Sequence, residues 1–297
     1  MATVPRAVFV HRQSALRDLI NRHGTYSQGS FFLKQRGLNA KGMVDGANAL
    51  QDALAAAGTA VPAHWRRGTV ERGDLDRFLF EAHDVVVVVG QDGLVANVAK
   101  YLDGQPVIGV HGGATGSGPL TRHQAKDCAR LFRDIDVGTA RYESRTMAEA
   151  RTDDGRSLCA LNEVFVGHPT HQTARYRLAT SEGRHEQQAS SGGVLVGTGT
   201  GATGWCASVR RERPDAPALP GPTEKLLAWF VREAWPSPTT GTTLVHGTLN
   251  RQTRLSLTIE SEGLVAFGDG IEADRLVLSW GERVDIGIAG KELRLVV

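Results

Sequence analysis

The chain has 297 residues, 41% of them hydrophobic, and a formal net charge of +2. This length allows one large or two medium domains with a sizeable core, and no apolar run approaches the ~20 residues of a membrane span. The small net charge, without a long basic tract interleaved with aromatic residues, argues against nucleic acid as the main partner.

The cysteines and the first residues bear on the compartment. Three cysteines, Cys128, Cys159 and Cys206, stand in unrelated contexts and give neither a disulfide framework nor zinc spacing. The opening residues lack the apolar segment of a signal peptide. We therefore expect a cytoplasmic protein, and with no HExxH motif we predict no metal site built from protein side chains.

The N-terminal part of the chain alternates between strand and helix patterns. Apolar β-branched runs predict strands, and apolar residues at helical spacing, ended by Gly24 and Gly58, predict helices. Such alternation is typical of a parallel sheet with right-handed crossovers, so residues 1–136 are assigned to an α/β domain. The predicted strands are 7–10, 85–89 and 107–110, and the predicted helices are 15–20, 47–57 and 75–80.

After about Val137 the chain changes to short β-type segments broken by Gly, Ser, Thr and Asp. These predict a β-rich, β-sandwich-like domain over residues 137–297, with the alternative that its last strand returns to the N-terminal domain. The predicted strands are 163–166, 173–179, 193–196, 255–259, 275–279, 284–288 and 293–297.

Two helices interrupt this β-rich part, at 204–211 and 224–235, on either side of a proline-rich surface loop at 214–222. In the second helix, the helical spacing of Trp229, Phe230 and Trp235 predicts core or subunit-interface anchors.

Five valines, 85–89, run directly into a turn that contains Asp92. A strand that is β-branched and apolar on both faces suits the centre of a parallel sheet covered by helices. Ligands of open α/β folds bind at the carboxyl ends of such strands, and glycines allow a ligand to approach the backbone. Asp92 is therefore placed to take a proton or help to hold a metal, although Asp-Gly is also a favourable turn dipeptide without further function.

A second strand leads into a loop of glycine and threonine, residues 197–204, which precedes a helix. Exposed backbone N–H groups and threonine hydroxyls suit a phosphate, a ribose or an amide. The formal GxGxxG from Gly199 to Gly204 suggests a Rossmann dinucleotide site. However, the acidic residue expected about twenty positions on would fall near Glu224 in the proline-rich region, so we favour a ligand-facing loop of another kind.

A third segment places Asn162 and Glu163 directly before a strand. An amide and a carboxylate together can donate to and accept from a base edge or a ribose hydroxyl. Taken alone, such a pair most often marks the exposed start of a strand.

These three segments in this order resemble the NAD kinase family, within the group that also holds diacylglycerol and sphingosine kinases. The family's Gly-Gly-Asp-Gly turn is matched by residues 90–93, its Asn-Glu pair by 162–163, and its Thr-Pro-Thr-Gly-Ser-Thr-Ala-Tyr-like loop, loosely, by 198–205. The resemblance runs from about Val85 to the C-terminus. It implies an N-terminal α/β domain, a β-rich C-terminal domain and an active site in the cleft between them.

The resemblance implies a kinase that transfers a phosphoryl group from ATP or polyphosphate to the 2′-hydroxyl of NAD, giving NADP. It implies that Asp92 approaches this hydroxyl, as a base or as part of the Mg²⁺–phosphate arrangement. Phosphoryl transfer asks the protein chiefly for positioning and charge neutralisation, and Mg²⁺ would be held mainly by the donor phosphates. The implied phosphate-binding residues are Gly90, Gln91 and Gly93.

The same resemblance assigns the bound nucleotide, NAD or a relative, to the second half of the chain. Asn162 and Glu163 are implied to hold the nucleoside. It also implies a homodimer or homotetramer. The composition argues against nucleic acid as a partner, and the sequence shows no amphipathic basic helix of membrane-surface type, so we expect no membrane partner either. The implied lining residues of the dinucleotide pocket are Thr198, Thr200, Gly201 and Thr203.

Five positions depart from the family pattern: Gly199 replaces a proline and Trp205 a tyrosine of the threonine loop, and three others bear on the acceptor. Gln91 replaces the second glycine of the turn, Leu94 a threonine, and Gly192 an aspartate that contacts the dinucleotide in the family. Two alternatives therefore stay open. One is the same fold acting on a different hydroxyl acceptor, which could be a nucleoside, another metabolite or a lipid, and the other is a non-catalytic nucleotide-binding protein.

Overall fold

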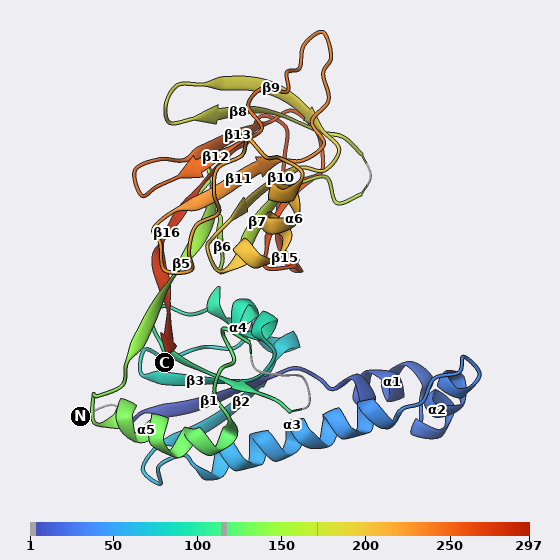
Figure 1. The fold of residues 1–297 in the computed structure, drawn as a ribbon, viewed down its shortest axis with the longest axis vertical. Coiled ribbons are helices and arrows are strands. Elements are labelled where there is room, and N and C mark those ends of the chain that lie inside the picture. The colour runs from blue at the N-terminus through green and yellow to red at the C-terminus, as the bar shows by residue number, and fades with distance from the viewer. Residues whose placement is uncertain (1–3, 114–117, 171) are drawn as a thin grey trace. The chain divides into compact units, whose positions relative to one another are not determined.

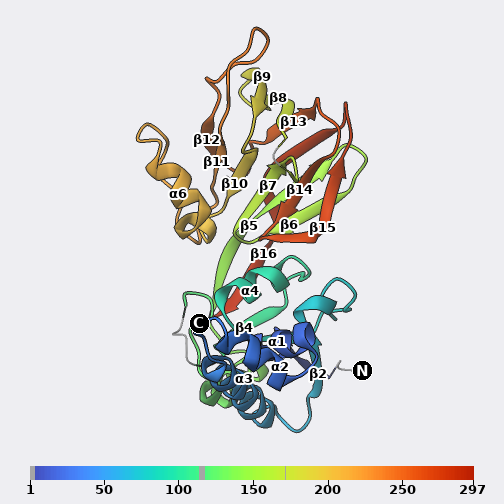
Figure 2. The ribbon, with the colours of Figure 1, turned by 90° about the vertical axis from the view of Figure 1, so that its right-hand side faces the viewer.

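The structure is a computed structural model that describes residues 4–113, 118–170 and 172–297. By its internal contacts the chain divides into two compact units. Unit 1 comprises residues 1–143 with 294–297, and unit 2 comprises residues 144–293. Both are built on β-sheet (Figures 1 and 2).

Unit 1 is a parallel sheet with helices on it. The strands lie in the order β2-β1-β3-β4, all parallel, and the end of β16 adds residues 294–295 in parallel beside β4. Its elements are β1 (Arg6–His11), α1 (Ala15–His23), α2 (Tyr26–Lys34), α3 (Lys41–Thr59), β2 (Arg66–Glu71), η1 (Arg72–Asp74), β3 (Asp84–Gly90), α4 (Asp92–Ala99), β4 (Pro106–His111), η2 (Ala125–Asp127) and α5 (Cys128–Asp136).

The valine strand β3 lies at the centre of this sheet, as its sequence predicts. Val85, Val87 and Val89 point to the face that is covered by α3 and α5, where they share one core with residues such as Ala57 and Phe132. The intervening valines, at 86 and 88, are fully buried on the opposite face. The alternation explains why both faces of this strand must be apolar.

Gly109 of β4 allows another part of the chain to lie against the strand. A Cβ placed at Gly109 would stand 1.8 Å from the carbonyl oxygen of Leu120 and 3.0 Å from Cα of Thr121. Because no side chain intervenes, His111 N donates to His123 O at 3.0 Å, and His123 N donates to Gly109 O at 3.1 Å. The segment 119–123 is therefore held beside the carboxyl end of β4.

Unit 2 contains the antiparallel strands. One sheet runs β12-β11-β10-β7-β14-β15, and the other brings together β16, β13, β8 and β9, with β5 paired to β16 and to β6. Its elements are β5 (Tyr142–Thr152), β6 (Ser157–Ala160), β7 (Glu163–Gly167), β8 (Ala174–Thr180), β9 (His185–Ser190), β10 (Val194–Gly197), η3 (Gly201–Thr203), α6 (Trp205–Arg211), β11 (Leu227–Val231), β12 (His246–Leu249), β13 (Leu255–Ile259), β14 (Leu264–Gly268), β15 (Ile271–Leu278) and β16 (Arg283–Val296).

The two sheets of unit 2 share one core, so this part of the chain is a β-sandwich. Val164 and Val194 point into that core, whereas Leu195 points to the outer face, where it packs with Cys206 of α6. Figure 2 shows α6 beside β10 and β11. The predicted fold class, a mostly parallel α/β sheet followed by antiparallel β structure, is confirmed.

Two predicted helices are wrong. Residues 227–231 of the predicted helix 224–235 form β11, in which Trp229 faces the sandwich core and Phe230 the side covered by α6. A short apolar run between turn-forming segments fits a buried strand as well as a helix, and pairing with β10 and β12 decides the matter. The predicted helix at 75–80 is too short to persist, and only the 3₁₀ turn η1 forms, just before it.

Replacing Gly109 with alanine is expected to push the 119–123 segment away from β4. We expect the free energy of unfolding to fall by about 1–3 kcal/mol, the usual cost of overpacking. Urea denaturation followed by far-UV circular dichroism measures it.

Gly46→Ala is the matched control, because Gly46 is an exposed residue of α3 whose added Cβ would meet nothing within 4 Å. It is expected to raise stability by roughly 0.5–1 kcal/mol. A Gly109→Ala chain as stable as the wild type would show that the close approach is not needed.

Candidate functional site

Asp92 is the first residue of α4, immediately after β3 and its glycine turn. Its Oδ1 accepts hydrogen bonds from the backbone N of Thr121 (2.8 Å), the Thr121 hydroxyl (2.7 Å) and the backbone N of Leu120 (3.2 Å). A carboxylate at the start of a helix is favoured by the helix dipole. Asp92 thus ties the end of β3 to the segment that follows β4, and its orientation is fixed.

The predicted phosphate-binding residues around Asp92 differ in how tightly they are packed. A Cβ on the neighbouring Gly112 would lie 3.3 Å from Cα of Gly90, so the two backbones approach closely. Gly93 is exposed, and an added Cβ there would meet nothing within 4 Å. Gln91 is exposed as well, and its side chain makes no hydrogen bond to cap α4. Its side chain therefore does not fill the turn.

In unit 2, the turn that carries Asn162 and Glu163 is held by Asp269. The Asp269 carboxylate accepts from three successive backbone N–H groups, at Leu161 (2.8 Å), Asn162 (2.7 Å) and Glu163 (3.4 Å). Its own N–H donates to Glu163 O at 3.1 Å. Asp269 is only 9% exposed and has a φ of 55°, a left-handed conformation that non-glycine residues rarely adopt.

The sequence reasoning missed the role of Asp269. The Asp-Gly dipeptide after a strand was the available signal, because a short polar side chain tolerates the left-handed turn and bonds nearby backbone groups.

Thr198 joins the threonine loop to the same turn. Its N–H donates to Asn162 O at 2.8 Å, and its hydroxyl donates to Leu161 O at 2.5 Å. The hydroxyl also accepts from the backbone N–H groups of Thr200 (3.1 Å) and Gly201 (3.3 Å). Asn162, Glu163 and the predicted loop residues therefore form one cluster in unit 2, in which the Thr198 hydroxyl is used inside the protein.

The other loop residues have distinct environments. A Cβ at Gly201 would stand 2.4 Å from Asn162 O, so only glycine fits. The Thr200 hydroxyl is buried and has no hydrogen-bond partner among the described residues, whereas Thr203 is exposed on η3.

Burial makes the carboxyl group of Glu163 a weaker acid than that of an exposed glutamate. Desolvation, and secondarily the negative charge of Asp269, raise the pKa of Glu163 to about 7 from its ordinary value of 4.5. At neutral pH this carboxyl group exists in both forms, and a protonated carboxyl can donate a hydrogen bond as well as accept one.

Trp205 anchors the end of the threonine loop. Its ring stacks on Phe165, with centroids 5.6 Å apart and planes 14° from parallel. The guanidinium of Arg232 lies 4.8 Å from the centroid of the Trp205 ring. Both groups hold the indole to neighbouring strands, so we assign Trp205 to positioning the loop.

Gly192, the position of a missing family aspartate, lies against another carboxylate. A Cβ at Gly192 would stand 2.8 Å from Cβ of Arg232 and 2.9 Å from Oε2 of Glu233. Glu233 has a φ of 53°, and its carboxylate accepts from Arg232 Nη2 at 3.2 Å. A side chain at position 192 would collide with both residues.

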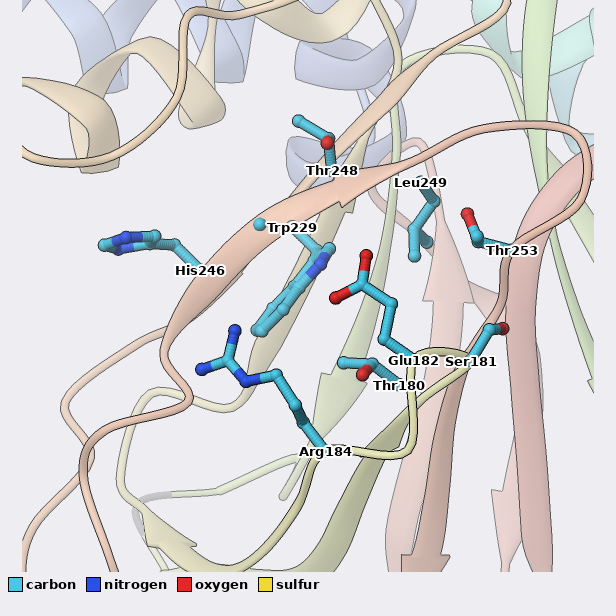
Figure 3. A pocket seen from close by; sticks show the side chains of 10 residues that line it. Thr180, Ser181, Glu182, Arg184, Trp229, His246, Thr248, Leu249 and Thr253 are labelled. Carbon is cyan, nitrogen blue, oxygen red and sulfur yellow. The ribbon is translucent and has the colours of Figure 1, made fainter.

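Outside these clusters, unit 2 has a pocket with a volume of about 220 Å³, below the ~300–1,000 Å³ typical of small-molecule sites. Figure 3 shows Glu182, Arg184, Trp229 and His246 around it. None of the predicted site residues lines it.

Residues 4–113, 118–170 and 172–297, which the structure describes, contain no group of three or more His, Cys, Asp or Glu side chains arranged to hold a metal ion. They also contain no helix that is long and apolar enough to cross a bilayer.

The fold of the chain has a counterpart among solved structures. A crystal structure of yeast NADH kinase complexed with NADH matches with a TM-score of 0.60 and 15% identity, covering 100% of this chain and 84% of that one. The chain therefore has the fold of a nicotinamide-nucleotide kinase.

Sequence comparison leads to the same family. An NAD kinase of Clostridium tetani is 30% identical over 131 residues, which is 42% of this chain and 47% of that protein. One from Geobacter metallireducens is 26% identical over 154 residues, 50% of this chain and 54% of that protein. The chain is thus a homologue of the NAD kinases, and the predicted relationship to that family is confirmed.

The extent of these matches is limited. The chain spans about half the length of the curated relatives it matches. A scan against protein-family models found no match.

The raised pKa of Glu163 predicts a pH dependence of stability. Between pH 4.5 and about 7 the folded state keeps a proton that the unfolded state has released, so stability falls as the pH rises through this window. The total loss from this group is at most about 3 kcal/mol. Glu163→Gln cannot ionise, so its stability relative to the wild type should increase between pH 5 and pH 8 in urea denaturation.

Glu262→Gln, which replaces an exposed glutamate, is the control for removing a carboxylate. A stability difference between Glu163→Gln and the wild type that stays constant with pH would show that Glu163 ionises as readily in the folded as in the unfolded chain.

Proposed function

We propose that the chain is a phosphotransferase that moves a phosphoryl group from ATP or polyphosphate to the 2′-hydroxyl of NAD, giving NADP. The observation that carries this proposal is the cluster in unit 2. Asn162 lies 36 residues from Thr198 in the sequence, yet the Thr198 N–H donates to Asn162 O and the Thr198 hydroxyl donates to the adjacent Leu161 O. An amide, a carboxyl and a rigid loop at one place supply the polar groups that a nucleoside needs.

Asp92 is proposed to act on the acceptor hydroxyl. One of its oxygens is already fixed by three hydrogen bonds, so the carboxylate need not reorganise when substrate binds. Such a group can accept the hydroxyl proton as the new P–O bond forms. The proton leaves the hydroxyl, and the donor's leaving phosphate takes the bonding electrons.

Magnesium fits this residue set only if the phosphates provide most of its ligands. The residue set offers the single carboxylate of Asp92 at the β3 turn, and one of its oxygens is engaged with Thr121. Mg²⁺ commonly binds through one or two carboxylates plus substrate phosphates and water. When bound, it would neutralise charge on the transferring phosphoryl group.

Asp92→Asn is expected to lower the rate of NADP formation by at least about a hundredfold, because the group that accepts the proton is lost. The remaining amide oxygen can still accept from Leu120 and Thr121. Purified chain is incubated with NAD, Mg²⁺ and ATP or polyphosphate, and NADP is quantified by chromatography.

Thr121→Val is the matched control, since it removes one bond to Asp92 but keeps its charge. It should retain activity within about tenfold of the wild type. Full activity in Asp92→Asn, or no NADP from any donor with the wild type, would overturn the proposal.

Gly192 favours a second candidate, in which the same chemistry acts on an acceptor other than NAD. The neighbourhood of Gly192 contains the carboxylate of Glu233, which comes from the end of β11 and is paired with Arg232. An acceptor that contacts this surface would meet a carboxylate in a different position from the family's aspartate. A panel of nucleosides and other hydroxyl compounds, tested with radiolabelled ATP, separates the two candidates.

Restoring the family's residue with Gly192→Asp is expected to destabilise the protein by about 1–3 kcal/mol through overpacking against Arg232 and Glu233. It should not improve the use of NAD. The double variant Gly192→Asp/Glu233→Gly should recover most of the stability, because glycine accepts the left-handed backbone and removes the competing carboxylate.

Glu233→Gly alone is the control for the second change. Urea denaturation of all three variants gives the coupling between the two positions. Equal destabilisation of the single and double variants would show that Glu233 does not occupy the space beside Gly192.

A further inference from the structure

Between β1 and β2, unit 1 carries a helical arm, defined here as residues 12–45. It comprises α1, α2 and the start of α3, and Figure 1 shows α1 and α2 at the end of α3 that is farther from the sheet of unit 1. The arm has a small core of its own, formed by Leu19, Leu33 and Ala40 with Phe32 and Met43 packed against it. The sheet core of unit 1 uses the other end of α3, at Ala57. The core of the arm and the core of the sheet therefore use opposite ends of α3.

The arm carries a positive net charge that the net charge of the whole chain does not reveal. It contains two acidic residues, Asp18 and Asp45, so its net charge is +4, and the rest of the chain, with a total of +2, is left with −2. No ion pair is recorded for its basic side chains among the residues that the structure describes. These basic residues are Arg12, Arg17, Arg22, Lys34, Arg36 and Lys41.

The arm also exposes large apolar side chains. Tyr26 is 47% exposed, Phe31 62% and Leu38 58%, so three of the nine exposed large hydrophobic residues of the described chain fall within 13 positions. Phe31 and Lys34 are three residues apart on α2 and therefore neighbours on its surface. Arg36 is kept near them, because its guanidinium lies 3.6 Å from the centroid of the Phe32 ring.

We propose that the helical arm docks on an anionic lipid surface. Basic side chains beside exposed aromatic and leucine side chains are the combination that binds such surfaces, with the charges attracted to acidic headgroups and the apolar groups entering the interface. Single-stranded nucleic acid could use the arginines and the aromatic rings, but it offers nothing to Leu38. A soluble polyphosphate chain offers nothing to either apolar group, so a lipid surface accounts for more of the arm.

This proposal departs from the expectation, based on the sequence, that no membrane is a partner. It does not depend on the proposed catalytic activity, since binding is measured without turnover. A kinase docked in this way would work beside a membrane while its nucleotide residues lie elsewhere in the chain.

Vesicle co-sedimentation of the full chain tests the proposal. Binding is expected with vesicles of equal parts phosphatidylcholine and phosphatidylglycerol at 50 mM salt, with little binding to pure phosphatidylcholine. Raising the salt to 500 mM should weaken binding at least about tenfold, because the Debye length shrinks to a few ångströms. Lys34→Glu/Arg36→Glu removes two basic side chains and should also lower the affinity at least about 25-fold, at roughly fivefold for each Lys or Arg lost.

Controls with the same changes elsewhere make the result specific to the arm. Arg77→Glu/Arg251→Glu alters the net charge equally at exposed positions outside the arm. Phe31→Ser/Leu38→Ser should weaken binding several-fold, whereas Val277→Ser/Trp280→Ser, at exposed residues of unit 2, should not. Thermal melts by circular dichroism check that each variant is folded.

Three outcomes would overturn the proposal. They are no binding of the wild type to acidic vesicles, equal losses in the arm variants and their controls, and binding of single-stranded RNA or polyphosphate by the arm in preference to vesicles. The last would assign the arm to a soluble polyanion.

Discussion

The carboxylate of Asp269, bound by three successive backbone N–H groups, is the interaction on which the unit 2 cluster depends. Without it, the N–H groups of residues 161–163 would lose this acceptor, and the turn that presents Asn162 O and Leu161 O to Thr198 would lose the side chain that holds it. A buried donor left without a partner costs about 1–3 kcal/mol, so the Asp269 hydrogen bonds and the threonine loop form together. The same charge helps to raise the pKa of Glu163.

Asp92 repeats this device in unit 1. Its carboxylate accepts hydrogen bonds from the N–H groups of Leu120 and Thr121. These two residues can approach β4 because Gly109 has no side chain. In both units an acidic side chain after a strand fixes a second segment that is distant in the sequence. Each such residue therefore has two roles, and loss of activity on its replacement is informative only beside a variant that changes the second segment alone.

The sequence was sufficient for the features that depend on local pattern. The β3 valines, the stop of α1 at Gly24 and the short helix after the threonine loop follow from periodicity and glycine placement. The sequence was insufficient where strand pairing determines the secondary structure. The run 227–231 is compatible with a helix or a strand, and its pairing with β10 and β12 makes it a strand.

The candidate site divides in the same way. Motifs were enough to name Asp92, Asn162, Glu163 and the threonine loop, because the residues that form a turn are neighbours in the sequence. Asp269 and Glu233 were not named, because each acts on a partner that is 41 to 108 residues away in the sequence, and the Asp269-Gly270 dipeptide indicates a turn without indicating that partner. The charge of the helical arm was hidden for another reason: summing over the whole chain cancels a local excess.

Strand β16 has a consequence for how the protein is made. Its residues 283–286 pair with β13 in unit 2, whereas residues 294–295 pair with β4 in the sheet of unit 1. During translation, β4 leaves the ribosome about 185 residues before residues 294–295 of β16 do, a delay of roughly 10–40 s at ordinary elongation rates. Over that interval residues 106–107 of β4 lack their β16 partner, whereas the carboxyl end of the strand can already pair with His123, so a short strand edge is open to chaperones that shield such edges.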